Sequence, residues 1–134
     1  MPPEEPFIIY SDGASRGNPG PAAIGAVIFD GQGREVYRIS RRLGVATNNE
    51  AEYRAAIAAL EAALALGARR VELRMDSELV VRQLTARYKV RNPRLIRYHR
   101  RILSLRPRFQ EVVVRHVPRG ENLLADSLAN QALG

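Results

Sequence analysis

The sequence predicts an α/β domain in which a five-stranded mixed sheet is flanked by helices, in the order βββαβααβα. Five short apolar runs bounded by Gly, Asn, Asp or Pro are typical of strands. Longer stretches repeat apolar residues at the spacing of a helix. Three strands come first and βα units follow, which is typical of a sheet with both antiparallel and parallel neighbours.

Length and composition favour one domain, since the chain has 134 residues and 46% of them are hydrophobic. We expect residues 1–6 to be a short tail and residues 7–134 to form the domain. No stretch of about 18 apolar residues predicts a membrane span, and the N-terminus lacks the features of a secretory signal. The absence of cysteine excludes disulfides and thiolate metal sites. We therefore expect a cytoplasmic monomer with no membrane partner.

The first third of the chain contains three predicted strands. A buried strand at Phe7–Tyr10 runs into Asp12 and then into a loop rich in Gly, Asn and Pro. A second strand covers Gly25–Phe29, and the residues DGQG at 30–33 predict a hairpin turn. Glu35–Arg41 alternates well enough to form the third strand.

The clearest helix covers Thr47–Leu66. Thr47 and Glu50 have the spacing of a capping box, and Gly67 favours termination at the other end. Its apolar stripe consists of Tyr53, Ile57, Leu60 and Leu64. The remaining predicted elements are a strand at Val71–Met75, a helix at Glu78–Arg87, a helix from Pro93 to Leu105, a strand at Glu111–His116 and a helix at Asn122–Leu133.

Positive charge is concentrated in one part of the sequence. The formal net charge is +7, but twelve basic residues and one acid, Glu111, lie between Arg82 and Arg119. Such a basic field indicates a polyanionic partner such as a nucleic acid. The alternative is that the excess of arginine reflects the base composition of the genome rather than a binding partner.

Two acids follow predicted strands that we expect to be parallel neighbours. Asp12 follows the first strand and Asp76 the fourth, so both side chains lie at one edge of the sheet. Adjacent strands are about 5 Å apart, which is close enough for two carboxylates to share a cation. Glu52 lies in the first turns of the long helix, where Ala56 and Ala59 on the same face allow close approach to the sheet.

Asp126 is the fourth acid, placed within an apolar helical pattern. Each acid alone has an ordinary explanation: a turn residue for Asp12, a helix cap for Asp76, a favourable dipole contact for Glu52 and an exposed position for Asp126. If they converge, their repulsion requires protons or a cation. With all-oxygen ligands, Mg²⁺ or Mn²⁺ is favoured over zinc, and two such ions can cleave a phosphodiester.

Four segments together resemble type 1 ribonuclease H: YSDGASRGNPGPAAIGAVI, TNNEAEYRAAIAALEAAL, MDSELVVRQL and HVPRGENLLADSLANQAL. The resemblance implies the ribonuclease H-like fold and an endonuclease that cuts the RNA strand of RNA–DNA hybrids with Mg²⁺ or Mn²⁺, giving 5′-phosphate products. It assigns catalysis and metal binding to Asp12, Glu52, Asp76 and Asp126. Glu50, two residues before Glu52, is assigned to the capping box.

The resemblance also implies an auxiliary residue ahead of the last helix. Some members have a histidine ten residues before the final aspartate, which matches His116, and others have an arginine seven residues before it, which matches Arg119. We favour Arg119, because the residues PRGEN predict a loop that reaches the scissile phosphate.

Further residues are implied to bind the hybrid. Asn18, Asn48 and Asn49 are candidates for minor-groove contacts and Thr47 for a phosphate of the DNA strand, although turns and caps explain them equally well. Many bacterial members carry an extra basic helix after the second helix, which helps to bind the hybrid, and this chain has no room for it. We expect Arg91 and Arg94 to supply part of that binding instead.

Two alternatives stay open at this point. One is a broader nuclease that also cuts double-stranded RNA, because members without the extra basic element have such breadth. The other is a hybrid-binding module without catalysis, which the presence of all four acids disfavours. Glu78 is a further departure, because glutamine is common at this position and an acid repels phosphate or alters metal binding.

Overall fold

The computed structural model describes residues 5–86 and 89–134. The elements follow the predicted order βββαβααβα, with two short 3-10 helices in addition. Most of the expected tail and Arg87, the expected end of a helix, lie outside the described residues. The strands are β1 (Phe7–Ser15), β2 (Gly20–Phe29), β3 (Glu35–Ala46), β4 (Arg70–Met75) and β5 (Glu111–His116). The helices are α1 (Asn48–Ala65), α2 (Glu78–Leu84), α3 (Pro93–Leu105) and α4 (Leu123–Leu133).

The strands form one sheet in the order β3-β2-β1-β4-β5. β1 pairs antiparallel with β2 and parallel with β4, so it lies at the centre of the sheet. β2 and β3 are antiparallel, and β4 and β5 are parallel. The predicted mixed five-stranded sheet is therefore confirmed.

The first three strands are longer than predicted. β1 ends at Ser15 instead of Tyr10, β2 begins at Gly20 instead of Gly25, and β3 ends at Ala46 instead of Arg41. The added parts of β1 and β2 pair with each other, and this ladder outweighs the weak strand propensity of the Gly- and Pro-containing segment. Asp12 therefore lies inside a strand rather than in a turn, which corrects the expectation that the strand ends before it.

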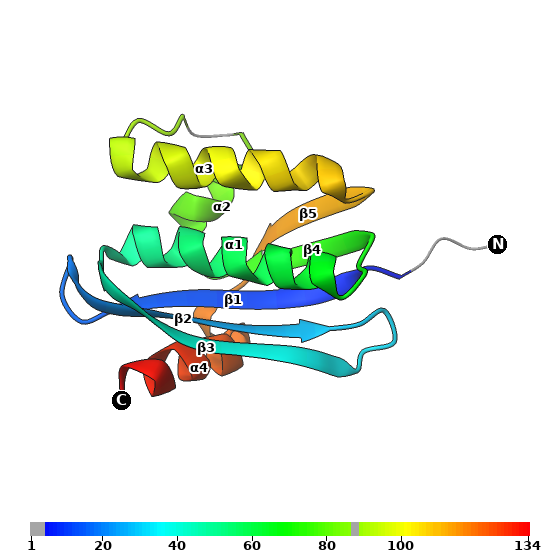
Figure 1. Ribbon diagram of the computed structural model, residues 1–134, viewed down its shortest axis with the longest axis horizontal. Helices are drawn as coiled ribbons and strands as arrows, with labels where there is room; N and C mark the ends of the chain where they lie inside the picture. Colours follow the sequence, from blue (N-terminus) through cyan, green and yellow to red (C-terminus); the bar gives the residue numbers. More distant parts are fainter. Residues whose placement is uncertain (1–4, 87–88) are drawn as a thin grey trace.

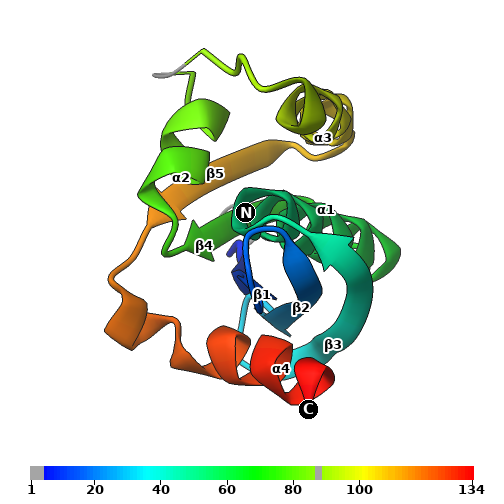
Figure 2. The same ribbon diagram turned by 90° about the vertical axis from the view of Figure 1, so that its left-hand side faces the viewer.

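Helices cover both faces of the sheet. α1 lies on one face and α4 on the other, and α3 runs beside α1 (Figures 1 and 2). The predicted capping box of α1 is confirmed, because the side chains of Thr47 and Glu50 each accept a hydrogen bond from the other residue's main chain. Pro93 begins α3 as predicted, whereas α2 stops three residues early, at Leu84.

The main core lies between α1 and the sheet. Ile9, Leu73, Tyr53 and Leu60 are fully buried there. Of the predicted apolar stripe of α1, Ile57 and Leu64 are only partly buried. The face of α1 that is fully or almost fully buried is instead rich in alanine: Ala51, Ala55, Ala56, Ala59 and Ala63. These small side chains let the helix lie close to the strands that carry the acids.

None of the helices in the described ranges has both the length and the apolar character that crossing a bilayer requires.

Candidate active site

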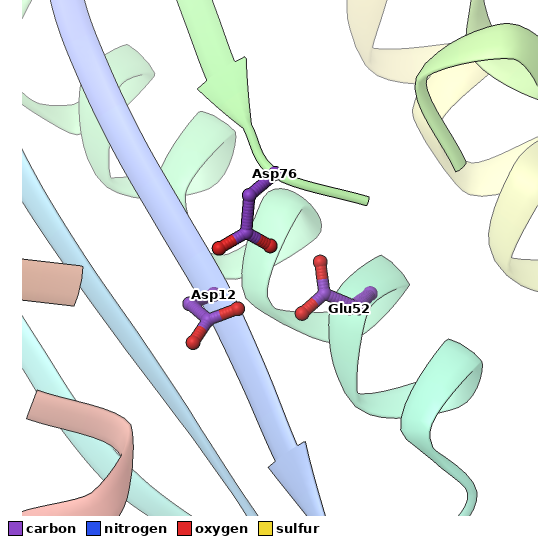
Figure 3. Close-up of side chains that lie close together, drawn as sticks. All are labelled: Asp12, Glu52 and Asp76. Carbon is purple, nitrogen blue, oxygen red and sulfur yellow. The ribbon is translucent and has the colours of Figure 1, made fainter. Parts of the chain in front are cut away.

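Three carboxylates converge where β1 and β4 leave their parallel pairing. Tyr10 pairs with Arg74, so Asp12 and Asp76, each two residues further on, are level with each other. Glu52 reaches them from the first turns of α1 (Figure 3). One oxygen from each of Asp12, Glu52 and Asp76 lies within 4.8 Å of the other two. The predicted convergence is thus observed for these three acids.

Gly13 brings α1 against the sheet. A Cβ atom on Gly13 would lie 2.2 Å from the main-chain carbonyl carbon of Ala51, so only glycine permits this approach. The N–H of Gly13 also donates to Oε1 of Glu52 at 2.7 Å. Gly13 therefore holds Glu52 in place beside Asp12.

The helix-cap explanation for Asp76 does not apply, and the acid in the first turn of α1 is Glu50 rather than Glu52. Ser77, not Asp76, caps α2 through a hydrogen bond from the N–H of Val80. Glu50 serves the capping box through the N–H of Thr47, at 3.1 Å. Asp76 and Glu52 are therefore left for the cleft, while Glu50 has the structural role that the sequence predicts.

Burial makes the negative charges costly. Asp12 is 5% exposed and Glu52 is 6% exposed. Burial, together with the hydrogen bond and the charge of Glu52, raises the pKa of Asp12 to about 10. Burial also raises the pKa of Glu52 to about 7, although hydrogen bonds from Asp12 and from the N–H of Gly13 act against it. Without a cation, the protonated form of Asp12 is favoured at neutral pH, and Glu52 is poised between its two forms.

The group fits a divalent metal ion. Oε2 of Glu52 is buried and has no hydrogen-bond partner among the described residues. The converging side-chain ligands are all carboxylate oxygens, the type that hard divalent cations prefer. A cation at this position would pair with the unpartnered oxygen and favour the charged forms of Asp12 and Glu52.

Asp126 approaches from α4, the helix on the opposite face of the sheet. A Cβ atom on Gly25 would lie 2.1 Å from the main-chain oxygen of Ala125, so α4 lies directly on β2 beside the strand residue that pairs with Asp12. Asp126 lines the same cleft as Asp12 and contributes to the raised pKa of Asp12. Asp126 is not one of the three acids whose oxygens lie mutually within 4.8 Å.

All four acids line one cleft of about 510 Å³. Of the residues singled out in the sequence, Arg119, Asn48 and Asn49 line it as well. Asn18 is connected to it, because its Oδ1 accepts a hydrogen bond from the N–H of Asn48 at 3.0 Å. Thr47 precedes α1, and its side-chain oxygen accepts from the N–H of Glu50.

His116 and Arg119 are placed differently. Arg119 begins a 3-10 helix, η2 (Arg119–Glu121), at the rim of the acidic cleft. His116 ends β5 and lines a separate hollow of about 310 Å³. Glu78 shares that hollow and is paired with Arg82, so it does not line the acidic cleft.

Arg91 and Arg94 do not line the cleft but lie at the beginning of α3. Both are exposed. A guanidinium nitrogen of Arg94 lies 3.8 Å from Oε1 of Glu50, which places the beginning of α3 beside the first turn of α1. The two arginines are therefore on the same side of the molecule as the asparagines at the beginning of α1.

Two asparagines escaped prediction. Nδ2 of Asn122 donates to the main-chain oxygen of Ser11 at 2.9 Å and lies 3.4 Å from Oδ2 of Asp76, so it connects α4 to the cleft. Asn130 lines the cleft one helical turn after Asp126. Its spacing from Asp126 is the one signal that pointed to a contact, since residues four apart meet on a helix.

Comparisons with known proteins agree with this geometry. The profile of the family described as "Reverse transcriptase-like" matches residues 10–132. Ribonuclease HI of Halobacterium salinarum is 51% identical over 124 residues, which cover 92% of this chain and 62% of that protein. The chain thus spans less than two thirds of that relative's length.

Two solved structures are similar throughout. The N-terminal RNase H domain of Rv2228c from Mycobacterium tuberculosis is 42% identical with a TM-score of 0.92, over 96% of this chain and 98% of that one. LC11-RNase H1 in complex with an RNA/DNA hybrid is 44% identical with a TM-score of 0.89, over 94% of this chain and 95% of that one. The five-stranded sheet and its flanking helices are those of the ribonuclease H-like fold.

Proposed function

The chain belongs to the ribonuclease HI family, and we propose that it is an endonuclease that hydrolyses the RNA strand of RNA–DNA hybrids and leaves 5′-phosphate ends. The observation that carries the proposal is the convergence of Asp12, Glu52 and Asp76 in a cleft that also holds Asp126. A related protein of known structure has been solved with an RNA/DNA hybrid, which supports the same class of substrate.

We propose that Asp12, Glu52, Asp76 and Asp126 bind Mg²⁺ or Mn²⁺. Such ions, when bound as a pair, activate a water molecule and stabilise the leaving oxygen of a phosphodiester. Both Glu52 and Asp126 raise the pKa of Asp12, so we propose that Asp12 is the carboxylate that serves both halves of the site. Glu52 offers its unpaired Oε2 while Gly13 holds the other oxygen.

The hybrid is recognised, in this proposal, at the edge of the cleft formed by the beginning of α1. Amides donate and accept hydrogen bonds, which suits the 2′-hydroxyls and base edges of a wide minor groove. Asn48 and Asn49 line the cleft, and Asn18 is connected to them through its hydrogen bond to Asn48. The hydroxyl of Thr47 accepts a capping hydrogen bond, and its own proton is left for a phosphate of the DNA strand.

Arginines extend this surface. Arg91 and Arg94 lie at the beginning of α3, beside the beginning of α1, and we propose that they bind phosphates of the hybrid. Arg119, at the rim of the acidic cleft, is the auxiliary residue in this proposal. A guanidinium keeps its charge at neutral pH, so Arg119 orients the scissile phosphate rather than transferring a proton. His116 is the alternative auxiliary residue.

A broader substrate range is the second candidate. α2 ends at Leu84 and α3 begins at Pro93, so the connection is too short for an additional basic helix that would select the hybrid. Minor-groove contacts to 2′-hydroxyls are available in double-stranded RNA as well. We therefore propose double-stranded RNA as a second, poorer substrate.

We further propose a cytoplasmic monomer in which residues 7–134 form a single domain. One chain supplies all four acids and the other groups that line the cleft, so a second copy is not required.

Cleavage of end-labelled duplexes tests the function. The hybrid should be cut in Mg²⁺ and left intact in EDTA, with duplex RNA cut more slowly and duplex DNA not at all. Asp12→Asn and Asp76→Asn should abolish cleavage. Glu50→Gln is the matched control, because Glu50 is a neighbouring acid that caps α1, and glutamine also suits that position. An Asp12→Asn protein that cuts at the normal rate would contradict the site.

A further inference from the structure

Asn130 contacts Asp126, the acid that approaches from α4 and does not belong to the group of three converging carboxylates. Its Nδ2 donates to the main-chain oxygen of Asp126 at 2.9 Å and to the carboxylate Oδ1 of Asp126 at 3.2 Å. Asn130 is itself exposed and lines the acidic cleft. Its amide is therefore the group that touches both the backbone and the side chain of Asp126.

The backbone around Asp126 is already held by other contacts. Gly25 allows α4 to lie on β2, and the hydroxyl of Ser40 donates to the main-chain oxygen of Leu128 at 2.6 Å. Nε of Arg42 donates to the main-chain oxygen of Ala132 at 2.8 Å. With α4 anchored along its length, the freedom left to Asp126 is rotation of its side chain, and Asn130 acts on that rotation.

We propose that Asn130 is a positioning residue that fixes the carboxylate of Asp126 for metal binding. By holding Oδ1, Asn130 leaves Oδ2 as the oxygen presented to a metal ion beside Asp12. The inference rests on the proposed function and adds a residue through which the helix on the far face of the sheet tunes the site. Groups that orient a metal-binding carboxylate commonly contribute to metal affinity and selectivity.

The choice of metal should depend on this contact. Mg²⁺ requires near-ideal octahedral geometry and tolerates a misplaced ligand poorly. Mn²⁺ binds more tightly to a given set of oxygen and nitrogen ligands in most sites and compensates for part of the loss. Releasing Asp126 should therefore weaken the use of Mg²⁺ more than the use of Mn²⁺, without changing how the hybrid is bound.

Three variants on α4 test this. Asn130→Ala removes the donor. Asn130→Ser keeps a short hydroxyl that bonds to the backbone but does not reach the carboxylate. Gln131→Ala is the matched control, since Gln131 is the exposed neighbour whose amide contacts Ser127 instead. Calorimetric titration of the purified proteins with Mg²⁺ and Mn²⁺ alone gives a readout without substrate, and cleavage of a labelled hybrid gives KM and kcat at each metal concentration.

The expected result is about tenfold weaker Mg²⁺ binding in Asn130→Ala and Asn130→Ser, with a smaller loss for Mn²⁺ and an unchanged KM for the hybrid. Gln131→Ala should match the wild type. Metal titrations of both Asn130 variants that equal the wild type and the control would overturn the inference while leaving the proposed function intact. A wild-type protein that neither binds divalent ions nor cuts the hybrid would overturn the proposed function itself.

Discussion

Replacing Asp12 with Asn should stabilise the metal-free protein while abolishing its activity. The pKa of Asp12 is raised from 3.8 to about 10 in the folded state, mainly by burial and then by Glu52. Between those two values the folded state binds more protons than the unfolded state. The free energy of unfolding therefore falls as pH rises through this range. Asparagine has nearly the same shape but does not titrate, so this loss disappears in Asp12→Asn.

The magnitude follows from the size of the shift. One pKa unit corresponds to about 1.4 kcal/mol, so a carboxyl group that ordinarily titrates near pH 4 costs up to about 4 kcal/mol by pH 7. Because the charge of Glu52 contributes to the shift and itself changes with pH, we expect Asp12→Asn to gain about 2–4 kcal/mol at pH 7. The gain should become small near pH 4 and vanish at lower pH, where both folded and unfolded wild-type chains carry the proton.

Urea unfolding in EDTA, followed by circular dichroism between pH 4 and pH 8, measures this difference. Asp30→Asn is a control with the opposite sign, because hydrogen bonds from Arg34 and Gln32 hold the pKa of Asp30 below its ordinary value. The carboxylate of Asp30 therefore stabilises the folded wild-type protein at neutral pH, and this contribution is lost as pH falls. The reasoning is refuted if Asp12→Asn is no more stable than the wild type at pH 7, or if its gain does not change with pH.

Three further variants test positioning, chemistry and binding. Gly13→Ala should destabilise the fold by about 1–3 kcal/mol in urea and reduce cleavage, because its methyl group would lie 2.2 Å from the backbone of α1. Arg119→Ala should lower kcat about 100-fold with little change in KM, whereas His116→Ala should stay close to wild type; the reverse order would reassign the auxiliary role. Neutralising Arg91 and Arg94 together should reduce the slope of log binding constant against log salt concentration by about 2, and an unchanged slope would remove α3 from the interface.

Added Mn²⁺ should raise the unfolding temperature of the wild-type protein and not that of Asp12→Asn, because the ligand stabilises the state that binds it. Differential scanning fluorimetry across a metal titration measures both shifts. Equal shifts in the two proteins would place metal binding outside the carboxylate cluster.

Local signals in the sequence predicted the elements that depend on neighbouring residues. The capping box at Thr47 and Glu50 and the start of α3 at Pro93 were confirmed, because caps and turns are formed by residues close in the chain. The mixed sheet, antiparallel in its first strands, followed from the order of elements. Glu52 was distinguished from Glu50 by the family resemblance and by the capping spacing, and the contacts of both residues agree with that distinction.

The errors concern features that depend on pairing between distant segments. The segment between Asp12 and Gly25 contains Gly, Asn and Pro and predicted a loop, but the antiparallel ladder of β1 with β2 makes most of it strand. Asn122 was predicted only as the beginning of a helix. Its contacts with Ser11 and Asp76 depend on how α4 crosses the sheet, which no local pattern in the sequence specifies.

The placement of α4 has a consequence for synthesis in the cell. Among the described elements α4 leaves the ribosome last, yet it must dock on β2 to bring Asp126 beside Asp12, which was translated near the beginning of the chain. Until that docking occurs, a nascent polypeptide exposes the surface around Gly25 and lacks one of its four acids. Nuclease activity should therefore appear only after α4 has left the ribosome and docked on β2.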